Sequence, residues 1–148
     1  MSYEKQIEVY RQHRTAQEKY VYFLLAATGA AIALAVNQTH DAKLMWSQIP
    51  LALAVGLWSL SFFFGCKHLH YVESTLFANG ELLKVLTGEH QEVGDNPQFI
   101  AATSEGIRKA INSNSKLAVQ FAHIQFLCLV FGAIAYLCWH VLEMWLRS

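Results

Sequence analysis

Three long stretches of the chain contain no formally charged residue, and no other feature of the sequence limits its fold as strongly. They are Tyr20–Thr39, Leu44–Cys66 and Leu117–Leu142, with 20, 23 and 26 residues. An α-helix needs about 20 mostly apolar residues to cross the roughly 30 Å hydrocarbon core of a bilayer. Each stretch is therefore long enough to span a membrane.

These stretches argue against a soluble helical bundle. A helix that is apolar on all sides must be buried on all sides, and three such helices in 148 residues leave too little chain to cover them. Composition agrees, because 15% of the residues are charged against about 25% in an ordinary soluble domain. The sequence predicts an all-α, polytopic membrane protein with transmembrane helices at 20–39, 46–66 and 117–142, the first two forming a hairpin over 20–66.

Residues 1–19 precede the first span and carry charges of both signs. Ile7, Tyr10, Arg14 and Gln17 recur at helical spacing, which predicts an amphipathic helix that runs into the first span. The segment is too long and too acidic for the first part of a typical signal peptide. We expect it to be a cytosolic helix.

Residues 67–116 are polar and are predicted to form a cytosolic helical hairpin, a stalk or docking head. Residues 88–96 are predicted to form the turn of the hairpin. Asn96 followed by Pro97 predicts the N-cap and first position of the second helix. Asn79-Gly80 predicts a bend in the first helix, and the polar run 112–115 predicts a hinge or a solvated turn before the third span. Residues 117–148 then form the third span and a short external tail. The apolar residues of the first helix keep near-heptad spacing: Leu69, Val72, Leu76, Leu83 and Leu86.

The distribution of Lys and Arg predicts the orientation. Nine of these residues lie in 1–19 and 66–116, whereas Lys43 and Arg147 flank the opposite ends of the spans. Because cytoplasmic loops carry the excess of positive charge, we expect the N-terminus and the hairpin to be cytoplasmic, in a cell inner membrane, and the C-terminus to be external.

Small residues recur one turn apart on the first two spans. Such pairs let two helices approach closely in a bilayer, where no hydrophobic effect drives their association. The simpler interpretation is contact between helices of one chain, and the alternative is an oligomer interface. The candidate packing residues are Ala26, Gly29, Ala30, Ala33, Ala52 and Gly56, together with Leu69, Val72 and Leu76 of the hairpin.

Gln120 and His123 lie three residues apart near the start of the third apolar stretch. Polar side chains at membrane depth usually face a partner helix or a water-filled cavity. A hydrogen bond between helices is the simpler interpretation, and the lining of a pore is the alternative.

Cys66, His70 and Glu73 can share one face of a helix and are ligand types for a transition metal. No second ligand pair at standard spacing occurs elsewhere, so they make half a site at best and we expect no metal or other cofactor. The chain has no nucleophile elbow, phosphate-binding loop or dinucleotide fingerprint, and its formal net charge is +0. We therefore expect neither an enzyme nor a nucleic-acid-binding protein.

The arrangement of an amphipathic entry helix, a tight hairpin of spans and a cytosolic helix covers about the first ninety residues. In this architecture, which involves no sequence motif, the chain is similar to small membrane effectors of bacterial defence systems. The resemblance implies a protein that self-associates in the bilayer and forms a pore or perturbs the membrane. The alternative is a non-catalytic accessory or assembly subunit of a larger membrane complex, and the partners in either case are lipid, further copies of the chain or other membrane subunits.

Overall fold

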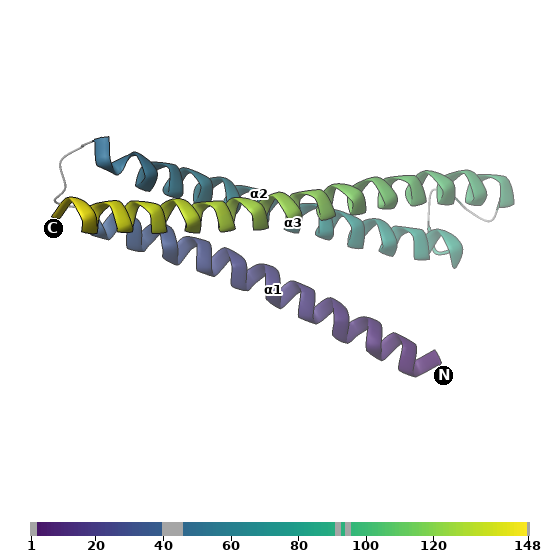
Figure 1. Cartoon of the computed structure of the whole chain (residues 1–148). Coiled ribbons are helices and arrows are strands. Elements are labelled where there is room, and N and C mark those ends of the chain that lie inside the picture. The colour runs from purple at the N-terminus through teal and green to yellow at the C-terminus, as the bar shows by residue number, and fades with distance from the viewer. Residues whose placement is uncertain (1–2, 40–45, 91–92, 94–95, 148) are drawn as a thin grey trace. The chain divides into compact units, whose positions relative to one another are not determined.

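The computed structural model describes residues 3–39, 46–90, 93 and 96–147, and this part of the chain is helical with no strand. Three long helices, α1 (Tyr3–Gln38), α2 (Ile49–Leu86) and α3 (Pro97–Arg147), follow one another, with the single 3₁₀ turn η1 (Trp46–Gln48) before α2 (Figure 1). Each long helix contains a segment apolar and long enough to cross a membrane. The predicted all-α class with three apolar helices is confirmed.

The helices are longer than the predicted segments because two polar stretches do not break them. α2 runs unbroken through Asn79 and Gly80, and α3 runs unbroken through residues 112–115. The predicted turn at 112–115 is therefore wrong, whereas the bend at Asn79-Gly80 stays a prediction, since a helix can bend without a break. Asn and Ser are only moderately unfavourable inside a helix, and three of the four residues at 112–115 are exposed, where they remain solvated. The helix from residue 1 is confirmed over its described part, since α1 runs from Tyr3 into the first apolar stretch. Asp41 and Lys43 lie outside the described residues.

Local capping fixes the two ends of the turn between α2 and α3. Gly88 has a positive φ of 74°, and the N–H groups of Gly88 and Glu89 donate to the carbonyls of Val85 and Lys84. This is the Schellman pattern, in which a left-handed glycine closes the helix end. At the other side, the Asn96 side chain accepts a hydrogen bond from the Gln98 N–H (3.0 Å). The predicted N-cap before Pro97 is confirmed.

The chain divides into two compact units. The apolar unit comprises Met1–Gly65 and Ile124–Ser148, and the hairpin unit comprises Cys66–His123. α2 and α3 contribute to both, because each is one continuous helix.

In the apolar unit the core is small relative to the apolar surface. Its centre is a cluster of Ala35, Leu51, Ala54 and Trp58. In the most apolar windows of α1, α2 and α3, 22%, 28% and 17% of the residues are buried. The remaining apolar side chains face outward, an arrangement that suits a lipid environment and would expose large apolar patches in water.

In the hairpin unit, α2 and α3 pack along a seam of residues spaced alternately by three and four. On α2 the seam consists of His68, Tyr71, Thr75, Ala78, Leu82 and Val85, all buried or half-buried. On α3 it consists of Ile100, Ser104, Ile107, Ile111, Asn114, Ala118 and Phe121, again buried or half-buried. Tyr71 stacks on Phe121 with ring centroids 5.5 Å apart, and the ring Nδ1 of His68 lies 2.8 Å from the Ala118 carbonyl oxygen. This spacing is that of an antiparallel coiled coil.

Candidate functional site

The most distinctive site of the apolar unit is a junction of three helices around Gly65. A Cβ built on Gly65 would lie 2.6 Å from Nε2 of Gln125 on α3 and 2.7 Å from a methyl carbon of Leu25 on α1. Glycine is therefore required where α2 passes between these two side chains. The junction brings the amide of Gln125 against the backbone of α2.

Gln125 is fully buried, and neither amide atom has a hydrogen-bond partner among the described residues. Its backbone carbonyl accepts a hydrogen bond from the Ser61 hydroxyl (2.8 Å). Thr28 is also fully buried, and its hydroxyl donates to the Leu24 carbonyl of its own helix (2.7 Å). An unpaired buried amide costs about 1–3 kcal/mol in protein mutational data. Gln125 is thus the most costly polar group of the apolar unit.

A second close contact lies two turns along α3. A Cβ on Gly132 would lie 2.6 Å from ring atoms of Trp58 and 3.3 Å from the Ala54 carbonyl oxygen. The Trp58 indole N–H donates to the carbonyl of Leu129 (3.3 Å). Gly132 therefore makes the space in which a tryptophan of α2 lies flat against α3.

Aromatic residues continue this contact towards the end of α3. Tyr136 lies beside both Trp58 and Trp139, with centroid separations of 5.6 Å in each pair. Its hydroxyl donates to the Gln38 side-chain oxygen at the end of α1 (2.7 Å). The three helices of the apolar unit are thus joined at this end as well.

Gln120 and His123, the predicted polar candidates, belong to the hairpin unit and are both exposed. The ring Nδ1 of His123 lies 2.9 Å from the carbonyl of Val119, one turn earlier in the same helix. For this pair, the part of the chain that the structure describes shows no hydrogen bond to another helix. Both side chains are free to face lipid, water or another chain.

The small residues predicted as packing candidates are not where the helices of the chain meet. Ala26, Ala30, Ala33 and Ala52 are exposed. A Cβ on Gly29 or Gly56 would have no described neighbour within 4 Å outside its own helix. The close helix crossings described above lie at Gly65 and Gly132 instead.

The leucine stripe of α2, defined by Leu69, Val72, Leu76, Leu83 and Leu86, lies one residue away from the seam that packs on α3. Its first three members are half-buried, and the last two are exposed (63% and 54%). Successive residues of a helix are rotated by about 100°. The stripe therefore forms a second face of α2, beside the one that contacts α3.

The weak metal candidates Cys66, His70 and Glu73 are each exposed. Within the described ranges, no group of three or more His, Cys, Asp or Glu side chains is placed to hold a metal ion. The His70 carbonyl accepts a hydrogen bond from the Ser74 hydroxyl (2.9 Å), and its ring lies against Tyr71.

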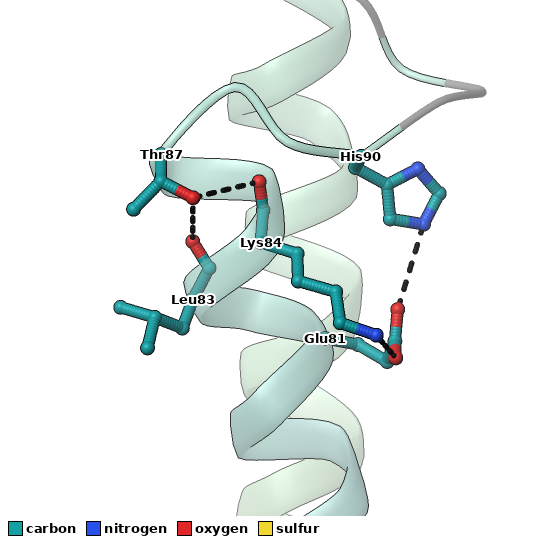
Figure 2. Close-up of polar contacts among 5 residues, drawn as sticks. All are labelled: Glu81, Leu83, Lys84, Thr87 and His90. Atoms are coloured by element: carbon teal, nitrogen blue, oxygen red, sulfur yellow. Dashed lines mark hydrogen bonds and ion pairs between the residues drawn. The ribbon is translucent and has the colours of Figure 1, made fainter.

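A polar cluster closes the tip of the hairpin unit (Figure 2). Glu81 forms an ion pair with Lys84 (2.8 Å), and its other carboxylate oxygen lies 3.7 Å from Nε2 of His90 in the turn. The hydrogen bond and charge of Lys84 hold the pKa of Glu81 below its ordinary value, with a smaller contribution from His90. Thr87 donates to the carbonyls of Leu83 and Lys84 at the helix end. These contacts join the end of α2 to the turn, so we interpret the cluster as structural.

Sequence reasoning missed Gly65, Gly132, Ser61 and Trp58. The signal available was weak, because a glycine at a crossing looks like a glycine on an open face until the partner helix is known. No family model, curated protein or solved structure matches the chain.

Proposed function

We propose that the chain is a multi-pass protein of the cell inner membrane that works as a self-associated assembly. The observation that carries this proposal is the contrast between two kinds of glycine. Gly65 and Gly132 are crowded by other helices, whereas Gly29 and Gly56 face open space. A glycine inside a helix costs about 1 kcal/mol relative to alanine, so glycines with no close neighbour in their own chain are best explained by a neighbour from another.

The environment of the open glycines fits such a neighbour. Exposed alanines lie one turn away from each of them, at Ala26, Ala33 and Ala52. Helix association in a bilayer depends on close packing of this kind of surface. Orientation follows from the nine Lys and Arg residues in 1–19 and 66–116, which favour a cytoplasmic N-terminus and hairpin unit and an external C-terminus.

A pore or membrane-perturbing effector is the activity we propose for the assembly. The contact of His68 with the Ala118 carbonyl places Lys67 near the level of Val119. His123 is four residues further along α3, about 6 Å at 1.5 Å per residue. In an assembly that turns this face of α3 towards its central axis, Gln120 and His123 would line that axis. They would lie just beyond the level of Lys67, the first charged residue of α2.

The surface of α3 beyond His123 also supports a second candidate function. Most of the exposed side chains there are apolar, among them Leu127, Val130 and Phe131. In a pore they would form an apolar constriction, which closes by excluding water. In an accessory subunit they would simply face lipid or a helix of another membrane protein.

Expression of the full chain alone, in a bacterial inner membrane and in liposomes, separates these functions. The pore predicts an oligomer by detergent-corrected light scattering and loss of membrane potential that His123→Ala or Gln120→Ala reduces. Ser113→Ala, another exposed polar residue of α3, should leave the depolarisation unchanged. An oligomer without ion leakage would reject the pore. A monomer that co-purifies stoichiometrically with a different membrane protein would reject self-association and favour the accessory role.

The small-residue surface is tested in the same preparation. Gly29→Leu and Gly56→Leu should shift the protein towards monomer, because added side chains keep the helices apart. Leu34→Phe adds bulk at an exposed position on another face of α1 and is the control. Oligomers that survive both glycine substitutions would show that these faces are not the contact.

A further inference from the structure

The leucine stripe of α2 repeats with the spacing of a coiled coil on the face beside the α3 seam. Leu69, Val72 and Leu76 are half-buried there, whereas Leu83 and Leu86 are exposed. With Asn79 included, residues 69, 72, 76, 79, 83 and 86 alternate steps of three and four over almost the whole α2 arm of the hairpin unit. This is the core spacing of a heptad repeat. The separate seam from His68 to Val85 already accounts for the contact with α3, and the exposed part of the stripe, from Asn79 to Leu86, is available to another partner.

Asn79 occupies a core position of the repeat, between Leu76 and Leu83, and is exposed. Asn79 is at a d position of the repeat, and its amide needs a polar hydrogen-bond partner once the core is buried. In a parallel, in-register pair of α2 helices, Asn79 of one chain lies opposite Asn79 of the second copy. A shift by one heptad would place the amide opposite Leu86 or Val72, which offer no such partner.

The proposed membrane topology makes parallel pairing the natural one. Copies that insert the same way and are related by rotation about the membrane normal present α2 in the same direction. In parallel pairs, a flanking residue faces the residue five positions later in the partner, which sets His68 opposite Glu73 of the second copy. The other flanking pairs in the stripe are Thr75 with Gly80 and Leu82 with Thr87, so no like charges meet.

We propose that the leucine stripe with Asn79 is the surface through which the hairpin unit binds a second copy of this chain, as a parallel, in-register α2–α2 coiled coil. The proposal rests on the self-association proposed above and names its cytoplasmic contact. Leucine at four core positions and valine at one do not single out a dimer, so the contact is compatible with a dimer or a larger ring.

Cysteine cross-linking of the full-length protein in membranes tests the contact. The background carries Cys66→Ser, Cys128→Ala and Cys138→Ser, and its oligomeric state is measured first. Asn79→Cys and Leu83→Cys should each give a disulfide-linked dimer on mild oxidation, because each residue meets its own counterpart. Ser74→Cys and Phe77→Cys point away from the stripe and are the controls, with a several-fold lower cross-linked fraction expected.

The outcomes distinguish this contact from self-association in general. An oligomer in which positions 79 and 83 cross-link no better than the controls overturns the α2 contact and leaves self-association standing. A monomeric background overturns both. A mixture of Asn79→Cys and Gly106→Cys proteins tests another arrangement, because Gly106 lies on α3. Cross-links that form only between these two different positions overturn the parallel arrangement in favour of α2 packing on α3 of the second copy.

Discussion

Replacing Gly65 by alanine tests the three-helix junction, since one methyl group has to fit where the structure has no room. The new Cβ would lie 2.6 Å from Nε2 and 2.9 Å from Cδ of Gln125, and 2.7 Å from a methyl carbon of Leu25. Contacts between such atoms are optimal near 3.5–4.0 Å, so side chains from two helices must retreat by about 1 Å. Gln125 is fully buried and cannot swing into solvent.

Overpacking of this kind costs about 1–3 kcal/mol, and the higher helix propensity of alanine returns about 1 kcal/mol at most. Gly65→Ala is therefore expected to destabilise the apolar unit by up to about 2 kcal/mol, the difference of these terms. Gly56→Ala is the matched control in the same helix, because its methyl group meets no described atom of another helix within 4 Å. For protein that is monomeric in micelles, where the proposed contact of Gly56 with a second copy is absent, Gly56→Ala should be neutral or slightly stabilising.

Reversible unfolding in mixed micelles, followed by tryptophan fluorescence and far-UV circular dichroism, measures both variants. Combining Gly65→Ala with Gln125→Ala removes the clashing amide and should recover part of the loss. Equal stability of Gly65→Ala and Gly56→Ala would refute the reasoning, because it would mean that the junction can open without cost. A double variant less stable than both single variants would show that the Gln125 side chain stabilises the folded protein by more than filling space.

Three other predictions follow from contacts described above. Ser61→Ala removes the hydroxyl that donates to the Gln125 carbonyl and should cost about 0.6 kcal/mol, the average for such bonds in a bilayer protein; a loss above 2 kcal/mol in the same unfolding assay would mean that it supports more than one bond. The folded-state pKa of Glu81 is lowered, so its stabilisation of the hairpin is present above the ordinary value of 4.5 and is lost as the pH falls through the folded pKa. The helicity of Glu81→Gln should vary less than that of the parent in this acidic range, and identical acid profiles would exclude the Glu81–Lys84 pair as the cause. Alkaline phosphatase fused after Ser148 should be active and a fusion at His90 inactive, and the reverse pattern would invert the proposed topology.

The helices could be predicted from the sequence because their signals are local. Three uncharged stretches of sufficient length, and a cap formed by adjacent Asn96 and Pro97, depend on no distant part of the chain. The expected turn at 112–115 failed because polarity was taken for a break, although Asn and Ser remain helical when their side chains are exposed or fit a seam.

The contacts between helices were harder to predict because they depend on rotation about each axis. The leucine stripe has the more apolar residues, yet α3 packs on the neighbouring seam, which includes Tyr71, Thr75 and Ala78. Likewise, Gly65 and Gly56 both lie in an apolar helix, and only the position of Gln125 distinguishes them. Composition identifies candidate contact faces on a helix, whereas the side chains of the neighbouring helix determine which of these faces is buried.

The burial of Gln125 has a consequence for the order in which the protein is made. In the proposed membrane topology, synthesis from the N-terminus brings α1 and α2 to the bilayer before α3 emerges, so Ser61 and the space at Gly65 would already be in place. An isolated α3 would expose its glutamine amide to lipid, whereas an α3 that enters beside its neighbours transfers that amide directly into protein. Biogenesis of this chain should therefore be sensitive to any factor that delays the meeting of the third helix with the first two, and α3 expressed alone should insert less efficiently than α3 preceded by α1 and α2.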